Sequence, residues 1–328
     1  MRIGSNPNSH KVVDISTTSH RVIIPVYIPN AEGYFKDALN VFKVCINSLV
    51  ATINSDTAIS IVSNGSSAEV NEYIYSLCRD GKVDRAVFNN ENVGKMNAVI
   101  AETRASFEEF VTYSDADVFF DKGWLKQTFA MFQNVSKAGF VSMNPTPGNY
   151  THADSTLIKN LFAVLFERKK TSTICDFSDL EHFHKSTGQN SSFTEKKFQS
   201  YVFCVSEENY IIGAGHFCCS IRKTPILKYV PKEKCNIAVS GGSESIYLDI
   251  PFDKTGLFRL SSPKAYVWHM GNVLEKDWVI KKNEELEGFT EESFSFHNLK
   301  KDVFNINLLP YSVKIFLVKV LKKLKIII

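Results

Sequence analysis

An Asp-Ala-Asp sequence follows a hydrophobic segment near the middle of the chain. Asp115 and Asp117 come directly after residues 110–114, which have the pattern of a β-strand. Residues i and i+2 of an extended chain point to the same side, so both carboxylates can face one cation. Mg²⁺ and Mn²⁺ prefer oxygen ligands and keep positions open for substrate phosphates. An acidic turn is the alternative explanation, and the position at a strand end favours the metal site.

The elements that must position these carboxylates alternate along the chain. Strands are predicted over residues 21–28, 58–62, 83–88 and 110–113, and helices over residues 39–53, 68–78 and 93–107. This alternation predicts βαβ units and an α/β fold with a mainly parallel sheet. Ligands of such sheets bind beyond the carboxyl ends of the strands. Residues 25–27, 63–65 and 114–117 are therefore expected at one edge of the sheet.

The composition excludes several classes of protein. The 328 residues include 44% hydrophobic and 22% charged residues, with only 10 Pro and 16 Gly, which excludes a disordered, collagen-like or polytopic membrane chain. The 38 basic residues exceed the 35 acidic ones by a net charge of only +3. No whole-protein basic field is present, so a nucleic-acid partner is not expected.

The cysteines and the first 20 residues predict a cytoplasmic protein. The 7 cysteines are odd in number and lack the spacing of a zinc site, so they are expected to be reduced thiols. Residues 1–20 form a polar leader without the apolar stretch of a secretory signal. No apolar run approaches the length of about 18 residues needed for a membrane-spanning helix.

Four segments, in this order and spacing, resemble the first half of the family 2 glycosyltransferases, whose fold is called GT-A. They are RVIIPVY, IVSNGSS, NNENVGKMNAV and YSDADVFFDKGWL, and the resemblance covers residues 21–147. It implies a Rossmann-like nucleotide-binding sheet flanked by helices and a nucleotide-sugar donor, with UDP as the expected nucleotide. It also implies a Mn²⁺ or Mg²⁺ cofactor and a role in bacterial surface-polysaccharide synthesis.

The resemblance also assigns residues to the nucleotide. These are Pro25, Val26, Tyr27, Asn64, Asn92, Lys95, Asn97, Ser114 and Asp115. Ser63 and Asn64 stand where the family more often has two acidic residues, and an Asn amide can still donate to and accept from a uracil edge. The alternative is that Gly94 only starts a helix and that Lys95 is solvated.

The metal, the base and the acceptor side are assigned in the same way. The resemblance implies a cation held by Asp115 and Asp117, with His269 approaching the metal or the diphosphate. Counting back from Gly256 places Glu244 on the family's Glu and Ser245 on the following Asp. Glu244 is therefore expected to be the base of an inverting transfer, and Asp249, about one helical turn further on, is the alternative.

Glycines and a histidine between these segments are assigned to the acceptor side. They are Gly213, Gly215 and His216, although a plain turn explains the glycines equally well. His182 and His184 are two positions apart, which does not make a metal site, and they are expected at the surface.

The predicted organisation has four parts. A leader over 1–20 precedes a glycosyltransferase domain over 21–272, which includes a polar, flexible insertion or flap at 169–200. A helical extension over 273–328 ends in a segment that gathers apolar residues on one side and lysines on the other. Such a basic amphipathic helix at 312–328 favours peripheral contact with a membrane, and packing on the domain is the alternative.

The sequence thus predicts a metal-dependent transfer of a sugar to a hydroxyl of a glycan or lipid-linked glycan, at the inner face of the plasma membrane. A nucleotidyltransferase that makes sugar nucleotides shares the sheet and the acidic site, but the segment around Pro25 lacks its Gly-rich phosphate loop. A non-catalytic subunit that binds sugar nucleotides is the other alternative, because Ser63 and Ser245 depart from the family pattern.

Overall fold

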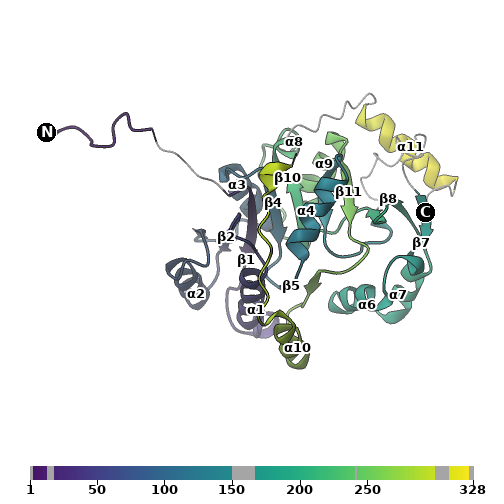
Figure 1. Cartoon of the computed structure of the whole chain (residues 1–328), viewed down its shortest axis with the longest axis horizontal. Coiled ribbons are helices and arrows are strands. Elements are labelled where there is room, and N and C mark those ends of the chain that lie inside the picture. The colour runs from purple at the N-terminus through teal and green to yellow at the C-terminus, as the bar shows by residue number, and fades with distance from the viewer. Residues whose placement is uncertain (1–2, 13–17, 150–166, 241, 300–309, 325–328) are drawn as a thin grey trace.

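The structure is a computed structural model that describes residues 3–12, 18–149, 167–240, 242–299 and 310–324. Its centre is a mixed β-sheet with helices on both faces, and residues 3–12 extend away from this body (Figure 1). The α/β class expected from the sequence is confirmed.

The strands that the structure describes form one large sheet in the order β3-β2-β1-β4-β10-β6-β11-β9-β8-β7 and a small sheet of β12 and β5. Strands β1, β2, β3 and β4 pair in parallel, β10 is antiparallel to both of its neighbours, and β11 is parallel to β6. Their bounds are β1 His20–Val26, β2 Thr57–Asn64, β3 Arg85–Asn89, β4 Phe110–Ser114, β5 Val118–Phe120, β6 Ala138–Ser142, β7 Glu167–Lys170, β8 Tyr201–Val205, β9 Tyr210–Ile212, β10 Cys218–Arg222, β11 Phe258–Ser261 and β12 Val267–His269.

The helices cover the two faces of this sheet. Their bounds are α1 Ala38–Ala51, α2 Ala68–Arg79, α3 Lys95–Ala105, α4 Trp124–Asn134, α6 Phe177–Ser186, α7 Ser191–Phe198, α8 Lys223–Leu227, α9 Ile250–Thr255, α10 Lys276–Leu286 and α11 Tyr311–Lys323. A π-helical turn, Ser245–Asp249, leads directly into α9. The strands and helices predicted over residues 21–113 are all present, with ends shifted by a few residues.

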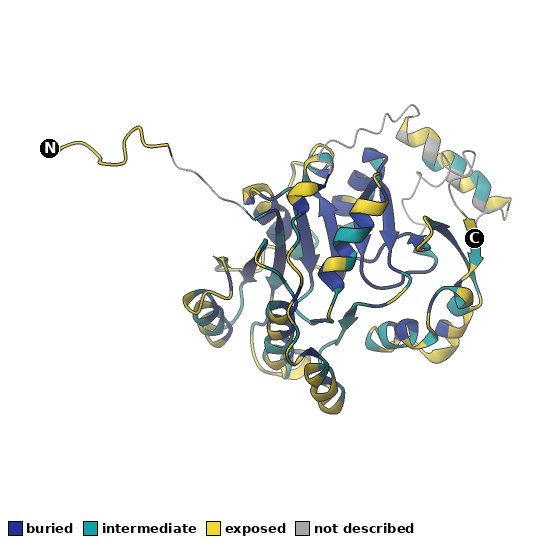
Figure 2. Ribbon diagram, in the orientation of Figure 1, coloured by how far each residue is buried: buried dark blue, intermediate teal, exposed yellow. Residues whose placement is uncertain are grey.

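Alternation along the strands separates two hydrophobic cores. On β1, Val22 and Ile24 face a core shared with α1, α2 and α4, whereas Ile23 faces a core shared with α3 and α9. Figure 2 shows these strands as the buried centre of the molecule. Because both faces are covered, the polar ends of the strands are where a ligand can reach the sheet.

The segment predicted as a flexible insertion at 169–200 contains helices α6 and α7 (Figure 1). Leu180 and Cys175 form a small core with residues of β8 and β9, and the Asn190 side chain caps α7 by accepting a hydrogen bond from the Phe193 backbone. These contacts give the polar segment a helical structure, and its role as a flexible insertion or flap stays a prediction. The surface position predicted for two histidines is wrong. His184 is buried and bonds Thr194, and His182 packs against Trp268 and Trp278.

The seven cysteines are free thiols, as predicted. No helix within the described residues is long and apolar enough to cross a membrane. The predicted C-terminal helix is present as α11, where Leu321 packs against the larger core while Phe316 and Leu324 are exposed.

The N-terminal residue of β1 is a completely buried histidine. His20 bonds Thr57 and Thr112 through its two ring nitrogens and stacks on Phe296, whose ring centre lies 4.8 Å away. Burial lowers the pKa of His20 to about 3, and the charges of nearby Asp56 and Glu108 only partly oppose this. The folded protein therefore keeps His20 neutral at pH values where the unfolded chain takes up a proton.

We predict that the lowered pKa of His20 makes the protein progressively less stable as the pH falls from 6.5 to about 3, because only the unfolded chain takes up the proton in this range. His20→Phe keeps the stacking but cannot titrate. Between pH 7 and pH 5, the free energy of unfolding of the natural protein should fall by about 2 kcal/mol relative to that of His20→Phe. Urea unfolding of both proteins at the two pH values measures this difference. An equal fall in both proteins would contradict the prediction.

Candidate functional site

Two adjoining cavities open at the carboxyl edge of the parallel strands. The first, the edge cavity, has a volume of about 490 Å³, and the second, the helix cavity, about 440 Å³. Lys95 and Asp115 line both cavities. The edge cavity is also lined by Pro25, Val26, Tyr27, Tyr34, Phe35, Asn64, Asn92, Asp117, Ala238 and Val239. The helix cavity is also lined by Pro145, Thr146, Asn149, Phe183, His184, Phe193, Lys197, Gly215, His216, Glu244 and His269.

Lys95 forms the partition between the cavities. It is the first residue of α3, directly after Gly94, whose φ of +88° suits glycine. Its Nζ lies 2.5 Å from Oδ1 of Asp115 and 3.6 Å from Oε1 of Glu244. Burial opposes the charge on Lys95, but these two carboxylates outweigh it, so the pKa of Lys95 is raised. Lys95 thus stays a cation between two anions and is not the solvated side chain of the alternative explanation.

Asp117 has a different environment from Asp115. Its Oδ2 lies 3.4 Å from Nε2 of His269, whose Nδ1 is hydrogen-bonded to Ser186. Its Oδ1 is buried without a hydrogen-bond partner within the described residues. Burial raises the pKa of Asp117, and the nearby imidazole of His269 opposes this. Asp117 is therefore a half-buried carboxylate with one buried oxygen left for a ligand.

Asp115, Asp117 and His269, predicted as metal ligands, lie around this point. Among the residues that the structure describes, no group of three or more His, Cys, Asp or Glu side chains is already arranged around a metal position. Their donor atoms, two carboxylates and an imidazole, nevertheless fit a divalent cation such as Mn²⁺, and the unpartnered oxygen of Asp117 is available for one.

Asn64 is buried at the end of β2 and uses its amide within the protein. Its Nδ2 donates to Oδ1 of Asn92, and its Oδ1 accepts from the backbone N–H of Val93. Asn64 and Asn92 both line the edge cavity. Their hydrogen bonds fix the wall of the cavity and leave less of the Asn64 amide for a nucleotide base.

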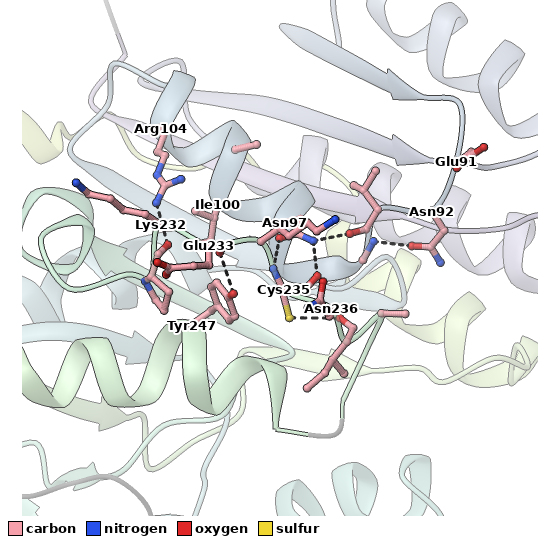
Figure 3. Close-up of a pocket in the computed structure, with 17 residues that line it drawn as sticks. Glu91, Asn92, Asn97, Ile100, Arg104, Lys232, Glu233, Cys235, Asn236 and Tyr247 are labelled. Atoms are coloured by element: carbon pink, nitrogen blue, oxygen red, sulfur yellow. Dashed lines mark hydrogen bonds between the residues drawn. The ribbon is translucent and has the colours of Figure 1, made fainter.

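Three predicted residues do not line the cavity for which they were expected. Ser114 is buried one position before Asp115, and alternation along the chain turns it away from the edge cavity. Gly213 lies behind the helix cavity, where its N–H donates to the carbonyl of Arg259. Asn97 lies on the far side of α3 (Figure 3).

Asn97 holds a loop that closes the edge cavity. Its Nδ2 donates to the carbonyl oxygens of Val93 and Cys235, and its Oδ1 accepts from the Cys235 backbone N–H. Figure 3 shows these bonds beside a separate cavity of about 620 Å³. Since Ala238 and Val239 of the same loop line the edge cavity, Asn97 shapes that cavity from behind.

Asp249, the alternative base, is a buried ion-pair partner. Its side chain is 0% exposed, and its Oδ1 lies 2.6 Å from Nη2 of Arg259 and 2.7 Å from Nε2 of His216. A carboxylate enclosed in this way cannot reach a substrate, so the expectation that Asp249 acts directly is wrong. Arg259 was not among the residues predicted from the sequence. A charged residue in the apolar sequence Gly-Leu-Phe-Arg-Leu was the available signal, because a buried arginine needs an acidic partner.

The residues from α6 and α7 were also missed. Phe183, His184, Phe193 and Lys197 line the helix cavity opposite His216 and Glu244. Their spacing along α6 and α7 is that of ordinary helical positions, and only the packing of these helices against the sheet brings them to the site.

The sequence of the chain matches that of a known protein family. The family described as glycosyl transferase family 2 matches residues 22–201, more than half of the chain. The chain belongs to this family. Family membership and the mixed α/β sheet together bear out the GT-A fold expected from the sequence. No curated protein matches the chain in sequence.

Several solved structures resemble parts of this glycosyl transferase family 2 chain. Staphylococcus aureus TarS 1-349 in complex with UDP-GlcNAc is 15% identical, with 39% of this chain and 34% of that chain covered and a TM-score of 0.33. Mannosyltransferase PcManGT from Pyrobaculum calidifontis, in complex with GDP-Man and Mn²⁺, is 15% identical. The match covers 45% of this chain and 44% of that chain, with a TM-score of 0.34. GalNAc-T7 with UDP, GalNAc and Mn²⁺ is 13% identical. The match covers 78% of this chain and 44% of that chain, with a TM-score of 0.45. The present chain spans less than half of each of these structures.

The role of Asn97 behind the edge cavity generates a prediction. Asn97→Ala removes three hydrogen bonds, each worth about 1 kcal/mol, and two of them connect α3 to the loop at Cys235. The backbone amides of residues 235–238 should exchange with solvent at least tenfold faster, while those of β1 and β4 keep their protection. Hydrogen exchange followed by mass spectrometry measures both.

Arg104→Ala is the matched control, because Arg104 makes a single longer bond of 3.3 Å to the Pro231 carbonyl of the same loop. It should change exchange at residues 235–238 by less than threefold. Equal effects of the two variants would show that Asn97 has no special role in holding the loop.

Proposed function

We propose that the protein transfers a sugar from a nucleoside diphosphate sugar, with UDP as the expected nucleotide, to a hydroxyl group of a glycan acceptor. The observation that carries this proposal is the pair of cavities joined at Lys95 and Asp115. A transferase must hold two substrates against one another, and the bond that is exchanged then lies at the partition.

The edge cavity suits the donor. Tyr27 and Phe35 form an aromatic edge-to-face pair at one end of it, which offers apolar surface to a nucleobase and ribose. Lys95, Asp115 and Asp117 lie at the other end, where a diphosphate would meet a cationic side chain. The nucleotide-binding roles of Pro25, Val26, Asn64 and Asn92 follow from their places in the same wall.

The metal-binding roles of Asp115, Asp117 and His269 belong to this proposal. A divalent cation bound there supplies Lewis-acid stabilisation of the diphosphate as it leaves. Asp117 and His269 would be its main ligands, because Oδ1 of Asp117 has no other partner and Asp115 is already paired with Lys95. Lys95 places a further positive charge beside the same phosphates.

The helix cavity suits the acceptor. Aromatic rings of Phe183, Phe193 and Phe217 alternate there with polar side chains, a composition that matches the apolar faces and hydroxyl groups of a sugar. A base in this cavity would take the proton of the attacking hydroxyl, and attack from the side opposite the diphosphate inverts the anomeric centre. Glu244, the base expected from the sequence, lines this cavity together with Asp115 and His216.

We place this reaction at the inner face of the plasma membrane of a bacterium, in the synthesis of a surface polysaccharide or lipid-linked glycan. The support is the family resemblance together with α11, whose exposed Phe316 and Leu324 are interspersed with lysines. The helical extension thus acts as a peripheral membrane anchor for the domain at 21–272.

The donor proposal predicts a metal-dependent binding event. Calorimetry with UDP-, GDP- and CMP-sugars should find one donor that binds at least tenfold more tightly with Mn²⁺ than without a metal. Asp117→Asn should abolish the effect of the metal, because it replaces the carboxylate that has the free oxygen.

Asp121→Asn is the matched control, since Asp121 bonds Lys282 and Trp268 and does not line the edge cavity. It should leave metal-dependent binding within twofold of the natural protein. If none of these sugar nucleotides binds under any metal condition, the transferase proposal is wrong.

The membrane proposal predicts that deleting residues 312–328 moves the protein from vesicles to solution. Each lysine near an anionic surface contributes about 1 kcal/mol, and the apolar side chains add to this. Co-sedimentation with vesicles containing phosphatidylserine measures the bound fraction, and vesicles of phosphatidylcholine alone are the control. Unchanged sedimentation of the truncated protein would contradict the proposal.

A further inference from the structure

His216 lies at the wall of the helix cavity and is connected to a buried ion pair. Its side chain is 29% exposed, whereas the Asp249 and Arg259 side chains behind it are 0% and 2% exposed. Three elements therefore meet behind His216. They are the segment before β10, the π-helical turn that ends at Asp249, and β11 with Arg259. This arrangement fixes the ring in one orientation.

The hydrogen bond to Asp249 determines which nitrogen of His216 is left for a substrate. Nε2 lies 2.7 Å from the Asp249 carboxylate, so a neutral His216 carries its proton on Nε2 and donates it to that carboxylate. The lone pair is then on Nδ1, for which no hydrogen bond to another described residue is found. The same Oδ1 of Asp249 that faces Nε2 of His216 lies 2.6 Å from Nη2 of Arg259, so the carboxylate is held in place on the side away from the ring.

Glu244 is a poorer proton acceptor in the same cavity. Its Oε1 lies 3.6 Å from Lys95, and its Oε2 accepts a hydrogen bond from the Ser243 hydroxyl. Burial raises the pKa of Glu244, but backbone hydrogen bonds and the charge of Lys95 together lower it by more. The pKa of Glu244 is therefore below its ordinary value. Both oxygens have partners, and Glu244 serves to balance the charge of Lys95.

We propose that His216 is the catalytic base of the transfer and that Asp249 is its positioning residue, an inference that rests on the proposed function. The acceptor oxygen attacks the anomeric carbon, and its proton passes to Nδ1 of His216. The bond between the anomeric carbon and the diphosphate oxygen breaks, and the diphosphate leaves with the electron pair. The imidazolium then returns its proton to solvent through the helix cavity.

The test uses donor turnover by the full chain, with the donor that binds in calorimetry. Water serves as the acceptor when no sugar acceptor is known, so release of nucleoside diphosphate reports the reaction. His216→Ala should lower kcat at least 100-fold and leave the donor Kd within about twofold, since general-base help contributes about 10²–10⁴-fold. Added imidazole at 50–100 mM, roughly, should restore at least a tenth of the lost rate, because it supplies the missing base.

Asp249→Asn and Glu244→Gln complete the comparison. Asp249→Asn should lower kcat at least tenfold without rescue by imidazole, because the His216 ring is still present but wrongly oriented. Glu244→Gln should weaken donor binding more than it lowers kcat. His297→Ala is the control for unspecific effects of imidazole, because His297 is exposed and lines neither cavity.

The outcomes separate the two proposals. Loss of donor binding in all proteins, including the natural one, overturns the proposed function. Retained donor binding with a His216→Ala rate within threefold of the natural rate overturns the role of His216, as does a 100-fold loss in Glu244→Gln with unchanged donor binding. Failure of imidazole to rescue His216→Ala, in a variant that keeps its unfolding temperature, also overturns it.

Discussion

The site depends on the ion pairs of Lys95, whose side chain is largely enclosed. A lysine at this depth is stable only beside opposite charges, and Asp115 and Glu244 supply them from two different parts of the chain. The ion pair with Asp115 joins the start of α3 to the end of β4. The contact with Glu244 adds the helical turn before α9. These three elements therefore hold a common geometry, and the two cavities meet where they do because one side chain lies between them.

A second buried charge pair extends this arrangement into the sheet. Arg259 lies on β11 and Asp249 at the end of the π-helical turn, and both are almost completely enclosed. Removing one partner of such a pair leaves the other charge unpaired in the interior, which typically costs several kcal/mol. The pair thus makes the position of the turn depend on the sheet. It links the side chains of the helix cavity to the strands that carry the edge cavity.

The first half of the fold could be predicted from the sequence because its signals are local. Apolar runs that end in polar turns mark β1, β2 and β4, and the carboxyl ends of parallel strands must lie at one edge. The errors have physical causes as well. Ser114 was assigned with its neighbour Asp115, but successive residues of a strand point to opposite faces. Asn97 was assigned from a motif, although it bonds a loop more than 130 residues later in the chain. The pairing of Asp249 with Arg259 depends on long-range contacts that no local pattern reveals.

The antiparallel strand β10 has a consequence for how this enzyme scaffold can change. It is bonded on one side to β4, which carries Asp115 at its end, and on the other side to β6, and His216 lies just before it. Asp115 and His216 are thus attached to adjacent, paired strands of one sheet. Helices α6 and α7, in contrast, pack on a small core of their own with β8 and β9 at the far end of the sheet. Apart from Ser186, which is hydrogen-bonded to His269, substitutions in this helical layer can alter the shape of the helix cavity while Lys95, Asp115 and Glu244 keep their spacing. The shape of the cavity and the spacing of its charged groups can therefore change separately in evolution.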